Sequence, residues 1–308
     1  MVGRRRGRAV AAVLAVAVVS AGCGKSANSG GSPSSPSSSP KTTITVGSVT
    51  FPESQIVAEM YAQVLAKAGY NIKKQLSIGQ REILQPAMPN QIQVAPEYVG
   101  SLLAYLKAGN QSNDPAAEVA ADNAALAPKG LTVLDPSAAN DVNAFVVTKA
   151  TADKYHLVRV SDMKPVAANL TLGGPPECAT RPLCLAGLKS VYGFTLKFQP
   201  IGSCDTQTAN ALDAGAVQVA LLCSTQAIIS KKGWVVLEDD KKLQPADNIA
   251  PEASVALLTA HPDIKDKLNA VSAKLTTGNI VGLNAQVEID HKDAAAVAQS
   301  FLQQQGLL

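Results

Sequence analysis

Polar residues occupy one setting repeatedly in this chain: they follow a predicted strand and begin a predicted helix. The segments are Ser48 to Ser54, Pro96 to Ser101, Ser203 to Thr208 and Ser224 to Gln226. Ligands of parallel sheets bind beyond the carboxyl ends of the strands, where helix N-termini present unpaired N–H groups that attract anions. Each segment alone could be no more than a helix cap. The four together predict a cleft for a small ligand, one that could carry a carboxylate.

Residues suited to covalent chemistry are scarce by comparison. The three histidines, His156, His261 and His291, lie near predicted helix ends, where solvated or capping roles are expected. The sequence has no G-x-S-x-G, no H-E-x-x-H and no phosphate-binding glycine loop. The Gly-Gly-Pro-Pro run at 173–176 lacks backbone donors that a phosphate needs, and Asp239-Asp240 is typical of a solvated turn. We therefore expect no catalytic residue, no metal site and no cofactor.

The N-terminus has the composition of an export signal. Residues 1–8 carry four arginines and no acid, residues 9–19 are an apolar run, and Ser20-Ala21-Gly22 precede Cys23. That order is typical of a secretory signal, and the apolar run is too short to span a bilayer. Because Cys23 stands where a lipoprotein signal peptidase leaves the new N-terminus, we predict a signal peptide over residues 1–22 and lipidation of Cys23. Ordinary secretion with an incidental cysteine is the alternative.

The segment after the predicted cleavage point is low in complexity. Ser26 to Pro40 consists almost entirely of Ser, Pro, Gly and Asn, and such a segment cannot bury a core. Residues 23–41 are therefore predicted to be a disordered tether between a membrane anchor and a folded body. Removing residues 1–22 lowers Lys plus Arg from 27 to 23, against 24 Asp plus Glu, for a net charge of about −1. This balance indicates no nucleic-acid surface.

Four of the five cysteines lie in the body of the chain: Cys178, Cys184, Cys204 and Cys223. An even number in an exported chain favours disulfides, and four cysteines allow three pairings. The short Pro-containing spacer between Cys178 and Cys184 suits a local loop closure, which leaves Cys204 to pair with Cys223. Zinc binding is the alternative, but the spacing does not fit it and no histidine lies near.

Strand-like and helix-like segments alternate through the body. Thr43 to Gly47 alternates and is rich in β-branched residues, which is typical of a strand, and the apolar residues from Ile56 to Leu65 recur at helical spacing. Thr50 and Glu53 have the spacing of a capping box at the start of that helix. The alternation continues to a last helical segment at Lys292 to Gln305. It predicts an α/β protein.

The body is long for a single sheet, so we predict two lobes, each a mostly parallel sheet flanked by helices. Phe145 to Thr148 and Ala253 to Leu258 are the predicted crossovers between them. Lobe 1 then consists of residues 42–144 and 252–308, and lobe 2 of residues 145–251. The C-terminal helices would return to lobe 1.

Seven segments carry a family resemblance: Gly47-Ser48, Phe51 to Tyr61, Gly79 to Glu82, Pro96 to Ser101, Asn143 to Thr148, Gly187 to Gly193 and Val236 to Asp240. Together they resemble the substrate-binding lipoproteins of glycine betaine, choline and carnitine ABC transporters, over most of residues 43–305. The resemblance implies a two-lobed periplasmic-binding-protein fold of type II that closes on its ligand. It also implies docking onto a membrane permease with its ATPase.

The resemblance further implies which residues meet the ligand. A quaternary ammonium has no hydrogen-bond donor, so proteins hold it with aromatic faces, and Tyr98 in the Pro-Glu-Tyr motif is the expected wall. Ser54 stands where many members carry a Gln near the ligand carboxylate, and Ser101 stands where a Thr is usual. Ser48 and Phe51, in the first matching segments, complete this half of the predicted site.

Other positions depart from the family pattern. Residues 140–143 contain no aromatic residue, Cys223 stands where a Tyr commonly precedes Ser-Thr, and Gln226 replaces an Asp. With only six Tyr and one Trp in the chain, a full aromatic cage is not expected. The predicted polar candidates for the pocket are Asn140, Asp141, Asn143, Thr225 and Gln226. The Asp141 carboxylate could pair with a cation or cap a turn.

These expectations combine into one leading hypothesis: a lipid-anchored, monomeric solute-binding component of an ABC importer on the extracytoplasmic face of the cell membrane, and not an enzyme. Its solute would be an osmoprotectant such as glycine betaine, choline, carnitine or proline. The expected partners are that solute, the permease and its ATPase, with membrane contact only through the lipid. The alternatives are the same scaffold for a less cationic or bulkier solute, a secreted two-lobed enzyme, and a ligand sensor.

Overall fold

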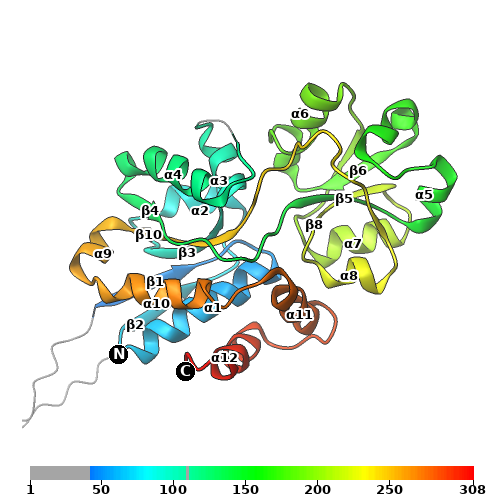
Figure 1. Ribbon diagram of the computed structural model, residues 1–308. Helices are drawn as coiled ribbons and strands as arrows, with labels where there is room; N and C mark the ends of the chain where they lie inside the picture. The colour runs from blue at the N-terminus through cyan, green and yellow to red at the C-terminus, as the bar shows by residue number, and fades with distance from the viewer. Residues whose placement is uncertain (1–41, 109–110) are drawn as a thin grey trace, which may run out of the picture. The chain divides into compact units, whose positions relative to one another are not determined.

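The computed structural model describes residues 42–108 and 111–308, which form two five-stranded sheets with helices around them (Figure 1). The predicted signal peptide, the lipidated Cys23 and the tether lie outside the described residues. None of the helices among the described residues is long and apolar enough to cross a membrane.

The first sheet has the strand order β2-β1-β3-β10-β4. Its strands are β1 (Thr43–Gly47), β2 (Asn71–Gln75), β3 (Val94–Tyr98), β4 (Leu131–Val133) and β10 (Ile249–Ser254). The helices around it are α1 (Pro52–Lys67), α2 (Arg81–Ala87), α3 (Val99–Leu106), α4 (Pro115–Leu126), α9 (Val255–Ala260), α10 (Asp263–Ser272), α11 (Thr277–Glu288) and α12 (Ala294–Gln304). Strand β1 pairs in parallel with β2 and β3, whereas β10 is antiparallel to β3 and β4.

The second sheet repeats this arrangement with the order β7-β6-β8-β5-β9. Its strands are β5 (Asn143–Val147), β6 (Thr171–Gly174), β7 (Lys197–Pro200), β8 (Val219–Cys223) and β9 (Val235–Val236). Its helices are α5 (Lys149–Tyr155), α6 (Leu185–Gly187), α7 (Thr206–Asp213) and α8 (Ala227–Lys231). Short helical turns cover Ala127–Lys129, Val160–Asn169, Pro176–Ala179 and Leu188–Tyr192. Here too, β6 is parallel to β7 and β8, and β5 is antiparallel to β8 and β9.

The α/β class and the two mostly parallel sheets agree with the sequence prediction, because four of the five strands in each sheet run in the same direction. In each sheet, one strand arrives from the other sheet and runs opposite to its neighbours: β10 in the first and β5 in the second. A strand that enters by a crossing segment is not bound by the right-handed strand–helix–strand connection that keeps neighbours parallel. Alternation of elements along the chain cannot reveal this difference.

Two extended segments connect the sheets, residues 134–142 between β4 and β5 and residues 237–248 between β9 and β10 (Figure 1). They run side by side, since Asn140 pairs with Asn248 and the Asp141 N–H donates to the Asp247 carbonyl at 3.0 Å. The predicted crossovers, Phe145–Thr148 and Ala253–Leu258, are therefore wrong: their apolar strand residues are buried inside β5 and β10. The lobe boundaries at 144/145 and 251/252 stay a prediction.

Helix α1 shows how the sequence builds the first core. Its residues Ile56, Met60 and Leu65 recur at helical spacing and are fully buried, and each such side chain contributes roughly 1.5–3 kcal/mol. The predicted capping box is wrong. Phe51 is the N-cap residue, Pro52 begins the helix, and no side chain caps it. Glu53 is instead turned into the protein, where it is 3% exposed.

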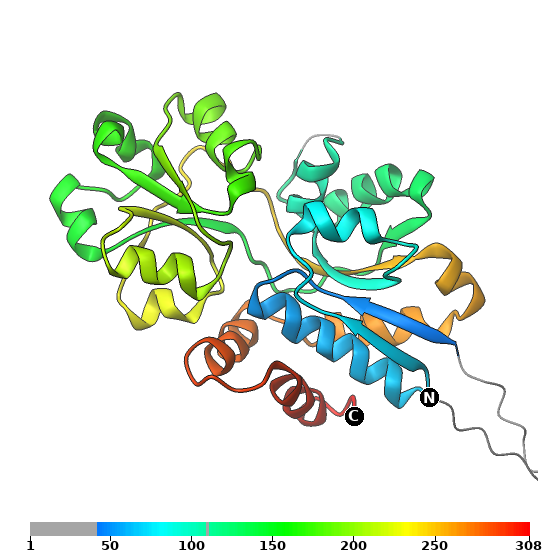
Figure 2. The ribbon, with the colours of Figure 1, turned by 180° about the vertical axis from the view of Figure 1, so that it is seen from behind.

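The C-terminal helices α10, α11 and α12 pack along α1 (Figure 2). Helix α11 also contacts α8 of the second sheet. Its Thr276 and Asn279 form a capping box that fixes its first turn. The helix therefore touches elements of both sheets, which makes it a third link beside the two connecting segments.

Candidate functional site

A cavity of about 250 Å³ lies where elements of the two sheets face each other. Its lining from the first sheet and the helices around it is Val49, Phe51, Gln80, Arg81, Glu82, Tyr98, Ser101, Ala104, Tyr105 and Lys107. Its lining from the connecting segments and the second sheet is Asp141, Asn143, Thr180, Arg181, Pro182, Leu183, Ser203, Cys204, Cys223 and Asp247. A cavity of this size suits a small solute.

Five of the residues predicted from sequence line this cavity: Phe51, Tyr98, Ser101, Asp141 and Asn143. They come from the end of β3, the starts of α1 and α3, the first connecting segment and the start of β5. Strand ends and helix starts therefore do meet, as the pattern of polar segments predicts.

The other five predicted residues do not line the cavity and bond to protein groups instead. Ser48 Oγ accepts the Ser77 N–H at 2.9 Å, and Ser54 Oγ accepts the Val49 N–H at 3.3 Å. Gln226 Oε1 accepts the Cys223 N–H at 3.1 Å, and Asn140 Oδ1 accepts the Asp247 N–H at 2.7 Å. Thr225, the fifth, is fully buried and donates to Glu53. These side chains stabilise the loops that carry the lining.

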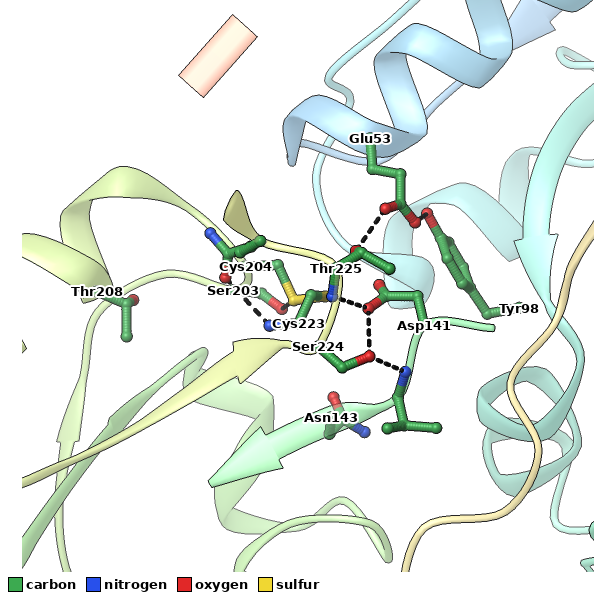
Figure 3. The surroundings of a disulfide bond; sticks show 12 residues. Glu53, Tyr98, Asp141, Asn143, Ser203, Cys204, Thr208, Cys223, Ser224 and Thr225 are labelled. Atoms are coloured by element: carbon green, nitrogen blue, oxygen red, sulfur yellow. Dashed lines mark hydrogen bonds between the residues drawn. A yellow bond between two sulfur atoms is a disulfide. The ribbon is translucent and has the colours of Figure 1, made fainter. Parts of the chain in front are cut away.

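Glu53 lies at the centre of a buried hydrogen-bond network that sequence reasoning missed (Figure 3). Its Oε1 accepts the Tyr98 hydroxyl at 2.9 Å, and its Oε2 accepts Thr225 Oγ1 at 2.5 Å and Asn284 Nδ2 at 2.7 Å. These partners come from β3, from the loop before α8, and from α11. One carboxylate therefore joins elements of both sheets. Burial raises the pKa of Glu53, and the three donors oppose that rise. The sequence does not reveal this role of Glu53, because its spacing from Thr50 matches a capping box.

Two acidic residues reach the cavity from the connecting segments. Asp141 Oδ1 accepts the Thr225 N–H at 3.0 Å and the Ser224 hydroxyl at 3.2 Å. Asp247 accepts the Ser101 N–H at 2.9 Å and the Ser101 hydroxyl at 2.6 Å. Burial raises the pKa of Asp141 well above its usual value, and the Glu53 charge adds to the rise. Burial likewise raises the pKa of Asp247 to about 7. A cation in the cavity would compensate both carboxylates.

The two arginines of the lining are each paired with a glutamate. Arg81 binds Glu97 of β3 at 2.8 Å in a buried ion pair. Arg181, from the segment after the turn Pro176–Ala179, binds Glu82 of α2 at 2.7 Å, so this ion pair joins the second sheet's side of the cavity to the first. Burial alone would raise the pKa of Glu82, but the Arg181 guanidinium outweighs it and lowers that pKa. Both guanidinium groups are thus paired with glutamates, and the Arg81 charge also opposes the rise in the pKa of Asp247.

Aromatic faces are few. Phe51 and Tyr98 lie with ring centroids 5.6 Å apart and planes tilted by 45°, and Tyr105 is the third aromatic residue of the lining. All three come from the first sheet and its helices. Such faces attract quaternary ammonium groups, and in this cavity they stand on one side only. Tyr61 is fully buried in the core, in keeping with a packing role.

The structure contains two disulfides, Cys178–Cys184 and Cys204–Cys223. Cys204 lies in the loop before α7, and Cys223 is the last residue of β8. Both line the cavity, next to Ser203 and close to Asp141 (Figure 3). Within the described residues, no group of three or more His, Cys, Asp or Glu residues is arranged to hold a metal ion.

The chain matches known proteins along almost its whole folded body. Residues 42–304 match a family model described as "Substrate binding domain of ABC-type glycine betaine transport system". A "Glycine-betaine-binding protein" of Pseudomonas aeruginosa is 26% identical over 284 residues, covering 86% of this chain and 89% of that protein. A "Carnitine transport binding protein OpuCC" of Listeria monocytogenes is 28% identical over 271 residues, covering 86% of this chain and 87% of its own length.

Solved structures agree with these matches. The "Crystal structure of glycine betaine/carnitine/choline ABC transporter" is 28% identical, with a TM-score of 0.66 over 86% of this chain and 99% of that one. The lactococcal OpuAC structure, 13% identical, matches in fold with a TM-score of 0.64 over 86% of this chain and 97% of that one. The two-lobed periplasmic-binding fold is thus confirmed. The chain belongs to the substrate-binding family of ABC-type glycine betaine transport systems, and it is the extracytoplasmic solute-binding component of such an importer.

Proposed function

We propose that this protein captures a small osmoprotectant, with the quaternary amines glycine betaine, choline and carnitine as leading candidates and the secondary amine proline as a further one. The observation that carries the proposal is the cavity itself, where the Phe51 and Tyr98 faces stand near the Asp141 and Asp247 carboxylates. Aromatic faces and a carboxylate are the two partners that a methylated ammonium can use. The names of the relatives, which mention glycine betaine and carnitine, support the same class of solute.

In this proposal the protein binds and releases its solute without changing it. It passes the solute to a membrane permease with its ATPase, and it acts as a monomer. No covalent step is required of Asp141, Tyr98 or the two disulfides, so the protein is not an enzyme. Lipidation of Cys23 would keep it at the extracytoplasmic face of the membrane. Replacing Cys23→Ala would then release the protein from the membrane fraction into the soluble one.

Titration calorimetry tests the solute class. Glycine betaine, choline, carnitine and proline are titrated in turn into the oxidised protein, with sucrose as an uncharged control. We expect heat from at least one of the four and none from sucrose. The absence of heat from all four would remove the osmoprotectant assignment.

A second candidate is the same scaffold with a less cationic or bulkier solute. It is favoured by the side of the cavity that carries Asn143, Ser203 and a disulfide where a tyrosine would complete an aromatic cage. Mass spectrometry of the solute that co-purifies with the protein separates the two candidates, because it needs no prior choice of ligand. A secreted enzyme would need a nucleophile or a metal in the cavity, and counting the free thiols of the purified protein would show whether Cys223 could be that nucleophile. Transport is distinguished from sensing by solute uptake in cells that lack the protein.

A further inference from the structure

The Cys204–Cys223 disulfide faces the solute cavity. Cys204 is 4% exposed and Cys223 is 7% exposed, and both line the cavity. Although both belong to elements of the second sheet, they are part of the apolar cluster that contains Val49, Phe51 and Tyr98 of the first. The disulfide therefore packs with the apolar cluster of the first sheet rather than with the core of its own sheet.

The two residues that follow Cys223 bond to Asp141 of the cavity lining and to the buried Glu53. These residues, Ser224 and Thr225, donate to Asp141, and Thr225 also donates to Glu53 (Figure 3). The Cys223 N–H donates to Gln226 Oε1 at 3.1 Å, which fixes the turn after β8. Any shift of Cys223 would thus move the donors that position the Asp141 carboxylate.

The loop at Cys204 depends on the covalent bond in a different way. Cys204 has φ of +49°, a left-handed conformation that residues other than glycine adopt at a cost in energy. Asp205 follows it and caps α7 by accepting the Thr208 N–H at 2.9 Å. The loop is thus anchored on one side by a helix cap and on the other by a sulfur–sulfur bond. Ser203 and Cys204 are held at the cavity as a result.

The second disulfide lacks these features and supplies a matched comparison. Cys178 and Cys184 are 0% and 1% exposed, belong to the apolar cluster of the second sheet, and are not part of the cavity lining. The Cys204–Cys223 disulfide therefore faces the cavity, whereas the Cys178–Cys184 disulfide lies in the core and closes the loop that carries lining residues 180–183.

We propose that the Cys204–Cys223 disulfide is part of the solute-binding surface and determines which solutes fit. Its sulfur atoms contact the apolar methyl or methylene groups of the bound solute, since sulfur is a soft and polarisable packing surface. The bond also fixes the loop at Ser203 and the turn at Ser224 and Thr225 around that solute. This inference rests on the proposed function, and it assigns the wall opposite the aromatic faces to a disulfide.

Two double variants test the inference by titration calorimetry with glycine betaine, choline and carnitine. The first is Cys204→Ala with Cys223→Ala, and the control is Cys178→Ala with Cys184→Ala. We expect the first variant to lose at least tenfold in affinity and to change the ranking of the three solutes. The control bond closes the loop that carries Thr180, Arg181, Pro182 and Leu183 of the lining, so the control should weaken binding of the three solutes by similar factors and keep their ranking. A first variant that keeps the ranking, or a control that changes it in the same way, would overturn the inference.

A second measurement on the unaltered protein remains decisive if a variant does not fold. The oxidised protein is treated with a water-soluble phosphine, which gains oxygen from water while each sulfur of a broken bond gains a hydrogen. Thiols formed with and without saturating glycine betaine, choline or carnitine are alkylated and counted by mass spectrometry. We expect bound solute to slow reduction of Cys204–Cys223 at least fivefold more than reduction of Cys178–Cys184.

The outcomes separate the inference from the function beneath it. If the oxidised protein binds a solute and both disulfides are protected equally, the inference is wrong and the proposed function stands. If the oxidised protein binds none of the tested solutes, the proposed function fails, and the inference fails with it.

Discussion

The side of the cavity supplied by the first sheet differs from the side supplied by the second in what holds its residues in place. On the first side, Tyr98 and Arg81 are fixed by buried partners, Glu53 and Glu97. On the second side, the Cys204–Cys223 bond ties the lining loops together covalently. The first side presents aromatic rings, and the second presents sulfur, hydroxyl and backbone groups.

This difference predicts where a single substitution should most reduce the affinity for the solute. In a buried network each donor and acceptor depends on the others, so removing one member leaves charged or polar groups without partners. A loop held by a covalent bond keeps its course when one neighbouring side chain is shortened. Substitutions on the first side should therefore cost more affinity than substitutions of similar size on the second.

The largest effect is expected from Tyr98→Ala. It removes the aromatic face and leaves the Glu53 carboxylate without one of its three donors. A desolvated cation–π contact contributes about 2 kcal/mol, which is about thirtyfold in affinity. Calorimetric titration with choline measures the loss. Tyr155→Ala, at a residue packed against the apolar cluster of the second sheet, is the control and should bind choline with the affinity of the unaltered protein. Equal losses of affinity in the two variants would contradict the role given to Tyr98.

Asp141→Asn should follow, with a loss of about tenfold for choline, because the amide has no negative charge to attract the quaternary ammonium. A tenfold loss corresponds to about 1.4 kcal/mol, which is less than the attraction of about 4 kcal/mol between two unit charges roughly 4 Å apart near a protein surface. The loss should be smaller for glycine betaine, whose own carboxylate makes it neutral overall. Parallel titrations with both solutes measure the ratio. The control is Asp213→Asn, which lies in an exposed ion pair with Lys232 and should change the affinity for neither solute. A larger loss for glycine betaine than for choline would contradict the assignment of a cation to Asp141.

The affinity for choline should rise with pH. The pKa of Asp247 is raised to about 7, so below pH 7 this group is mainly protonated and cannot compensate a cation. Because a bound cation favours the ionised form, binding releases a proton, and affinity increases as pH rises through 7. The gain from pH 6 to pH 8 is at most about tenfold for one such group. The raised pKa of Asp141 acts in the same direction.

Titrations followed by the fluorescence of the single tryptophan, across this pH range, provide the check. The same titrations with Asp247→Asn are the control, and the profile should flatten in that variant. An affinity that falls with pH in the parent protein would mean that the bound solute does not favour the ionised carboxylate.

The smallest effect is expected from Arg181→Ala, which breaks the ion pair that joins the two sides of the cavity. Both partners are partly exposed, at 23% and 34%, and such pairs contribute roughly 0.2–1 kcal/mol. We expect about threefold faster dissociation of the solute in stopped-flow measurements. Exchanging the charges, Glu82→Arg with Arg181→Glu, should restore the slower rate. Failure of the exchange to do so would assign the effect to lost packing instead.

The sequence predicts the fold class, the two sheets and part of the lining because those depend on local pattern. Tyr98 could be predicted from the Pro-Glu-Tyr motif, and Asp141 from the polar segment at residues 140–143. Asp247 could not be found in this way, since its partners Ser101 and Asn140 lie more than 100 positions away in the chain. The role of Glu53 was also out of reach, because its spacing from Thr50 matches a capping box, whereas burial against Thr225 and Asn284 determines what it does. Long-range contacts leave no periodic mark in a sequence.

Two of the three acidic residues that line the cavity, Asp141 and Asp247, lie on the segments that connect the sheets, and these segments are hydrogen-bonded to each other. When two bodies rotate about a shared axis, points near the axis travel least. Closure by rotation about these two segments would therefore move Asp141 and Asp247 less than the aromatic and disulfide walls of the cavity. A positively charged guest can be captured first by these carboxylates and enclosed afterwards, so recognition of charge precedes recognition of shape.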